Sequence, residues 1–251
     1  MSTESEPTPA KQDAAQSTET EHARSDDAAP VVFPVGHYMG PFHPDVDAPV
    51  KHHIVRVGWN TPKLPDEAHL NIWALAHGLP GGPDTTRWTR QAIIEAADEA
   101  EMPDAEAILD TLAGLGLIAE VTPGTPQARE FAESYRLNAL MIGLGNSPDD
   151  PVLDAIGLAG LPPVLKVRPR IFEVWQWAHL WPSLWSACEG LAWVAGEDEE
   201  ARPPEDADAD ALLDFMLEAI RHLISANAVY LDVVTTPRSA SSNSEKPPAT
   251  G

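Results

Sequence analysis

The sequence has 251 residues, of which 43% are hydrophobic and 25 are prolines, and its formal net charge is -23 at pH 7. This length suffices for two small hydrophobic cores, and the prolines indicate much connecting chain. The negative charge disfavours nucleic acid, anionic membranes and acidic substrates as partners at long range. A single cysteine, Cys188, excludes an intrachain disulfide framework and a CxxC metal site.

The setting predicted by these features is the cytoplasm. A reducing compartment suits a chain with one cysteine, and the first residues show no signal-peptide pattern. No stretch has the roughly 18 apolar residues that a membrane span requires, so no membrane partner is expected.

Three segments are too polar to bury a core. Residues 1–30 and 236–251 consist largely of Ser, Thr, Glu, Ala and Pro, which predicts a disordered acidic tail at one end and a disordered tail at the other. Residues 196–210 (GEDEEARPPEDADAD) predict a solvated acidic loop.

The ordered part begins with an irregular lead-in over residues 31–64, in which only Val50 to Val57 has the pattern of a strand. From Leu70 the apolar residues follow a helical period, and this helix begins near Asp66 and ends at Gly78. A second helix follows with Thr89 as its N-cap.

A third helix is predicted from Asp104 to Leu115, with a strand from Leu117 to Val121 directly after it. A helix that ends in LxxLGLI before a strand and a Pro/Gly turn resembles the winged helix-turn-helix superfamily, over about residues 65–145. The resemblance implies a wing and a last helix that enters the DNA major groove. This helix carries Asp104, Glu106 and Asp110 but no basic residue, which argues against that use. The segment 126–135 (PQAREFAESY) predicts extra helical turns where the superfamily has a short hairpin.

The second half repeats this order after a linker at 146–170. Within 171–235 we expect a Trp-bearing helix over 171–180, a helix from Pro182 to about Val194, a helix over 211–226 and a strand over 229–233. Two interpretations stay open for this domain: a degenerate second winged-helix unit, or a plain helical subdomain packed on the first. The expected fold class is mainly α with small β wings (α+β).

Two features of the second half are candidates for partner binding. The first is a tryptophan cluster that forms either the core of this domain or an aromatic groove for a peptide, with the members Trp175, Trp177, Trp181 and Trp185. The second is a basic row that lies on one face if its segment is extended, with the members Lys166, Arg168 and Arg170. This row suits an acidic peptide, a phosphate backbone or the acidic loop of the chain itself.

Other functional motifs are weak. The basic residues available for DNA contacts outside the third helix are Arg87, Arg90, Arg129 and Arg136. His37 and His43 are weak metal candidates because their spacing matches no common ligand pattern. No nucleophile elbow, HExxH, Walker A loop or GxGxxG is present, and no cofactor is expected.

The leading hypothesis is a non-catalytic cytosolic winged-helix protein that binds a protein or peptide, by itself or in a larger assembly. The alternative is a winged-helix DNA-binding transcriptional regulator, with a monomer or a dimer both open. A second alternative is an enzyme with a pocket between its domains. These rest on analogy at the level of the fold.

Overall fold

The computed structural model describes residues 29–79, 88–197 and 208–235. In these ranges the chain forms seven α-helices and four small sheets, with 43% of the residues helical and 28% in strands. The fold is mixed α+β, so the prediction of a mainly α fold with small wings is wrong. Nearly all of the predicted tails and most of the acidic loop lie outside the described residues.

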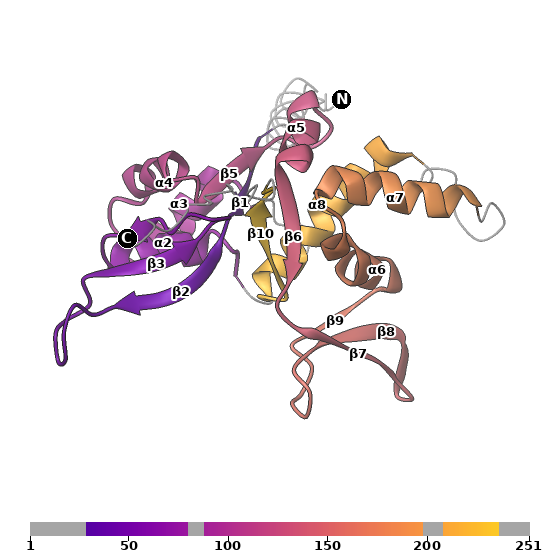
Figure 1. The fold of residues 1–251 in the computed structure, drawn as a ribbon, viewed down its shortest axis with the longest axis horizontal. Helices are drawn as coiled ribbons and strands as arrows, with labels where there is room; N and C mark the ends of the chain where they lie inside the picture. The colour runs from indigo at the N-terminus through magenta and orange to yellow at the C-terminus, as the bar shows by residue number, and fades with distance from the viewer. Residues whose placement is uncertain (1–28, 80–87, 198–207, 236–251) are drawn as a thin grey trace, which may run out of the picture.

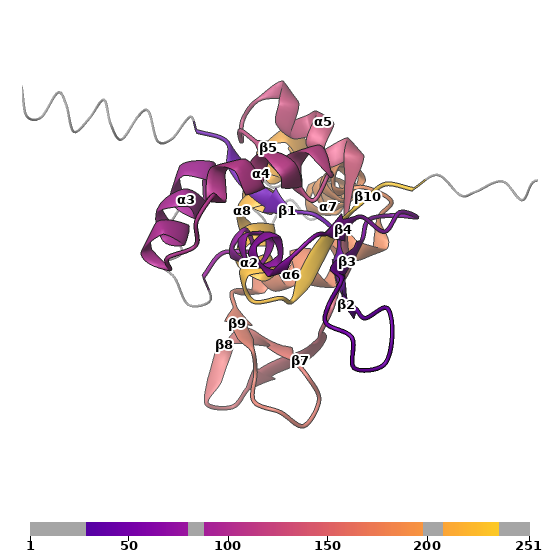
Figure 2. The same ribbon diagram turned by 90° about the vertical axis from the view of Figure 1, so that its left-hand side faces the viewer.

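Two three-stranded antiparallel sheets account for the error in fold class. The segment expected to be an irregular lead-in holds four strands: β1 (Val31–Pro34), β2 (His37–Phe42), β3 (His52–Arg56) and β4 (Lys63–Leu64). The segment expected to be a linker lies largely in the strands β7 (Ile142–Ser147), β8 (Asp150–Gly157) and β9 (Leu165–Val167). The β7–β9 sheet projects from the body of the molecule (Figures 1 and 2).

The helices of the first half begin where their capping residues predict. Asp66 accepts a hydrogen bond from the amide of His69 and starts α2 (Glu67–Leu75), and Thr89 starts α3 (Arg90–Glu99) in the same way. They are followed by α4 (Ala105–Gly114) and β5 (Ile118–Val121).

The second half also keeps the predicted order of helices and final strand. Helix α5 (Pro126–Ser134) is the extra helix expected after the strand at 117–121. The other elements are β6 (Tyr135–Ala139), α6 (Pro169–Trp177), α7 (Leu184–Glu197), α8 (Ala209–Ser225) and β10 (Val229–Val233). A short 3-10 turn, Ala178–Leu180, lies between α6 and α7.

The element order shows an internal repeat. Residues 31–121 form a first unit: a strand, a three-stranded sheet, three helices and a last strand that pairs antiparallel with the first one. Residues 135–233 form a second unit with the same order and the same pairing of its first and last strands. Helix α5 connects the two units.

The sequence carries a trace of this repeat at the start of the third helix of each unit. Residues 104–110 read DAEAILD and residues 208–214 read DADALLD. Both third helices are followed, two positions after their last residue, by a residue of positive φ, Gly116 (68°) and Asn227 (53°), and the last strand begins two positions further on. The same helix-to-strand turn is therefore built twice.

Strand β1 lies between two hydrophobic cores. Val31 and Phe33 point into the core formed with α5 and the helices of the second unit, whereas Val32 points into the core of α2–α4, which Val35 joins just after the strand ends. Alternate side chains of a strand face opposite sides, so a fully apolar β1 can serve both cores. The two units also meet where the amide of Gly36 donates to the carbonyl of Leu231 (2.7 Å). Strands β6 and β10 lie in the middle of the molecule (Figure 1).

Candidate functional site

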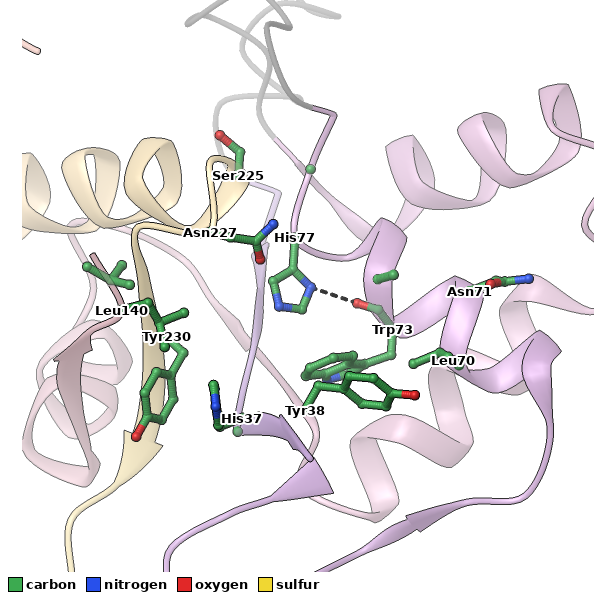
Figure 3. A pocket seen from close by; sticks show the side chains of 14 residues that line it. His37, Tyr38, Leu70, Asn71, Trp73, His77, Leu140, Ser225, Asn227 and Tyr230 are labelled. Atoms are coloured by element: carbon green, nitrogen blue, oxygen red, sulfur yellow. Dashed lines mark hydrogen bonds between the residues drawn. The ribbon is translucent and has the colours of Figure 1, made fainter. Parts of the chain in front are cut away.

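A pocket of about 480 Å³ lies where the two repeat units meet (Figure 3). One side comes from α2 and the start of β2, and the other from the end of α8, the residue after β6, and β10. This volume falls in the range of small-molecule sites and also fits one large side chain of a partner. The described residues that line it are Gly36, His37, Tyr38, Leu70, Asn71, Trp73, Ala74, His77, Gly78, Leu140, Ser225, Asn227, Val229 and Tyr230.

The wall on the first unit is aromatic and held in place by hydrogen bonds. The indole N–H of Trp73 donates to the carbonyl of Leu117 (3.1 Å), which fixes the ring from behind. Tyr38 packs beside it with ring centroids 6.4 Å apart, and its hydroxyl lies 2.9 Å from Nδ1 of His53. Because these polar atoms are already satisfied, this wall offers a ligand mainly apolar ring surface.

His77 supplies a directed polar group. Its Nδ1 donates to the carbonyl of Trp73 (2.9 Å), and its ring meets the indole edge-on at 4.6 Å. Burial lowers the pKa of His77, so the ring is neutral at pH 7. With the proton on Nδ1, Nε2 is a hydrogen-bond acceptor. Figure 3 shows the ring between Trp73 and Asn227, with its second nitrogen on the side of His37 and Tyr230.

Tyr230 forms the opposite wall, and its ring packs at a tilt of 37° against His37 of β2, with ring centroids 4.8 Å apart. The hydroxyl of Tyr230 accepts a hydrogen bond from Arg56 (2.6 Å), and Arg56 also pairs with Asp232 (3.1 Å). Burial, and then the nearby Arg56, lower the pKa of His37, while Asp232 acts in the opposite direction. Both pocket histidines are therefore neutral near pH 7, and the pocket suits an uncharged anchor with an N–H or O–H donor.

The lowered pKa of His77 predicts that acid destabilises the fold. Below a pH of about 6.5 the unfolded chain binds a proton on His77 that the folded chain resists, so the free energy of unfolding falls as the pH decreases. Urea unfolding at a series of pH values measures this slope. In His77→Gln the slope between pH 7 and 5 should be smaller, with His37 contributing to what remains. Equal slopes in both proteins would contradict the assignment.

The predicted tryptophan cluster is divided between core and surface. Trp175 and Trp185 are 7% and 8% exposed and belong to the second core, whereas Trp177 and Trp181 are 43% and 38% exposed. Trp175 and Trp177 lie two residues apart on α6 and therefore on opposite sides of the helix, whereas Trp181 directly follows the 3-10 turn. None of the four lines the pocket.

The predicted basic row does not form a single extended face. Strand β9 ends at Val167 and α6 begins at Pro169, so Arg168 and Arg170 lie at the start of a helix. Lys166 pairs with Asp150 (2.9 Å), and the guanidinium of Arg170 lies 4.0 Å from the ring centroid of Phe215.

The arginines considered for DNA contacts are spread over the molecule. Arg90 binds Asp110 and Glu120 (2.8 Å each), and Arg129 lies 4.0 Å above the ring of Trp185. The Nε of Arg136 on β6 is buried without a hydrogen-bond partner. Arg87 lies outside the described residues.

The two weak metal candidates have other contacts. The ring of His37 packs against that of Tyr230, and Nδ1 of His43 lies 2.8 Å from the carbonyl of Ala48. In the part of the chain that the structure describes, no three His, Cys, Asp or Glu side chains are grouped so that they could hold a metal ion.

The sequence interpretation did not identify the pocket, because its walls come from segments far apart in the chain. The repeated DAxAxLD segment could have indicated two units and hence a junction between them.

Comparisons with protein families, curated proteins and solved structures found no match. Across the described ranges, no helix is long and apolar enough to cross a membrane.

Proposed function

We propose that this chain is a non-catalytic cytosolic protein that binds a protein or peptide and holds one side chain of its partner in the junction pocket. The observation that carries the proposal is the pocket itself, which has rigid aromatic walls and a neutral histidine acceptor. Large aromatic surface with few polar groups is typical of pockets that receive an anchor residue.

The alternatives receive less support from the geometry. The described lining of the pocket includes no carboxylate to pair with His77 as a general acid or base. Burial raises the pKa of Cys188 to about 12, so this thiol is protonated and a poor nucleophile. For DNA binding, Arg90 pairs with Asp110 and Glu120 and Arg129 pairs with Glu133, which leaves little free positive charge at these positions.

Selection of random short peptides on the immobilised full chain tests the proposal. The test variant is Ala74→Trp. Ala74 lines the pocket and its side chain is exposed, so a tryptophan at this position should fill the pocket. The matched control is Ala113→Trp, the same change at an exposed position of α4. Enriched peptides should share an anchor residue and bind the wild type and the control alike. Their affinity for Ala74→Trp should fall at least about tenfold, which corresponds to about 1.4 kcal/mol.

Circular dichroism of the three proteins checks that the fold is intact. If no peptide is enriched, or if the enriched peptides bind Ala74→Trp as tightly as the wild type, the pocket is not the binding site and the proposal is wrong.

A further inference from the structure

The face of the β6–β10 strand pair that points away from the second core carries two hydrogen-bond donors without partners. Leu137 on β6 points into the second core, so its neighbours Arg136 and Asn138 point to the opposite face. The register pairs Arg136 with Asp232 and Asn138 with Tyr230, so all four side chains share that face. Figure 1 shows the two strands side by side between the units.

Two donors on this face are unsatisfied. The Nε of Arg136 and the Nδ2 of Asn138 are buried and have no hydrogen-bond partner. Asp232 lies opposite Arg136, but its carboxylate already accepts from Arg56, from the amide of Gly58 (2.6 Å) and from that of Val233. Within the described ranges no ion pair reaches Arg136, although the chain has 39 acidic residues. Buried donors without acceptors are unfavourable, and native proteins usually supply them with a partner.

The first unit shows what the same face does when it is part of the core. There the face of β1 directed away from its own helices carries Val31 and Phe33, and α5 covers it with Phe131 against Phe33 (5.3 Å). In the second unit the equivalent face is polar. An apolar helix such as α5 would leave the donors of Arg136 and Asn138 unpaired, so a partner for this part of the face has to supply acceptors.

We propose that this face binds an acidic segment of the peptide partner, with a carboxylate on the guanidinium of Arg136, whose side chain is partly exposed, as is that of Asn138 beside it. Arg is well suited to carboxylates because its planar fork can donate two hydrogen bonds. The inference rests on the proposed function and specifies the class of its partner: a peptide with an anchor residue and an Asp or Glu.

The face leads directly into the pocket, which sets the spacing between the two groups. Arg136, Asn138 and Leu140 follow one another on the same side of the chain, and Leu140 lines the pocket. Four residues of extended chain span about 13 Å. A peptide that lies along β6 therefore reaches Arg136 about four residues from its anchor.

Random short peptides selected on the full chain provide the test. Enriched peptides should carry an Asp or Glu about four residues from the anchor. This enrichment would be specific, because the net charge of -23 repels acidic peptides in general. Changing that Glu to Gln should weaken binding to the wild type at least about tenfold, but should have little effect on binding to Arg136→Gln. Lys63→Gln removes one exposed positive charge from β4 and should behave like the wild type.

The outcomes separate the two proposals. If pocket-dependent peptides lack an acid, or if the Glu-to-Gln penalty is the same in Arg136→Gln, the acidic-partner inference is overturned and the pocket proposal stands. If no peptide binding depends on the pocket, both are overturned.

Discussion

Replacing Asp232 with alanine is expected to lower the free energy of unfolding by about 2–4 kcal/mol. Asp232 is 6% exposed and connects the two repeat units, because its carboxylate accepts from Arg56 and from the amide of Gly58. Its loss leaves that amide without its acceptor and Arg56 without its charge partner. Arg56 is 35% exposed and can be rehydrated, so the expected cost lies below that of breaking a fully buried pair.

Two variants isolate the cause of this effect. Asp232→Asn keeps an oxygen that can accept from Gly58 but loses the charge, so its cost should be intermediate. Asp110→Ala removes an aspartate that also pairs with an arginine, Arg90, but is 72% exposed, and it should cost less than about 1 kcal/mol. Urea unfolding of the four proteins measures the differences. If Asp232→Ala costs no more than Asp110→Ala, Asp232 does not hold the units together.

The helices could be predicted from the sequence because their signals are local. The Asp66 and Thr89 caps start α2 and α3, and an apolar stripe followed by glycines identifies α4. The last strand of each unit directly follows its third helix, so it was predicted as well. These elements depend on residues a few positions apart.

The projecting sheet could not be predicted in the same way. In β7, Gly143 and Gly145 interrupt the alternation of apolar and polar residues, and the pairing with β8 shifts register beside both. Most side chains of β7 are exposed, so burial imposed no pattern on the sequence. The segment therefore had the composition of a linker although it forms strands.

The pocket depends on pairings at long range. Trp73 and Tyr230 face the same space only because β1 contacts β10 and the second unit folds back onto the first. Taken alone, each aromatic residue of the pocket has the sequence pattern of a core residue. The tryptophans at 175–185 were singled out instead, because they are clustered in the sequence. The pocket exists because walls from distant parts of the chain come together, and no pattern of neighbouring residues predicts this.

The strand contact beneath the pocket depends on Gly36, and Gly36→Ala is expected to cost about 3–5 kcal/mol in the free energy of unfolding. The φ of Gly36 is 98°, a conformation that alanine rarely adopts. A Cβ there would also lie 2.8 Å from the carbonyl oxygen of Arg56 and 2.7 Å from a methyl of Val55. The carbonyl belongs to the β3 backbone and cannot move aside without disturbing the sheet.

Gly40→Ala separates the two contributions. Gly40 has a similar φ of 105°, but no atom lies within 4 Å of where its Cβ would be. Its substitution therefore carries the backbone strain alone, and we expect a cost of about 1–2 kcal/mol. The difference between the two variants in urea unfolding measures the steric term at Gly36. If the two variants lose equal stability, β2 can move away from β3 at this point, and the close packing of Gly36 against β3 is not required for the stability of the fold.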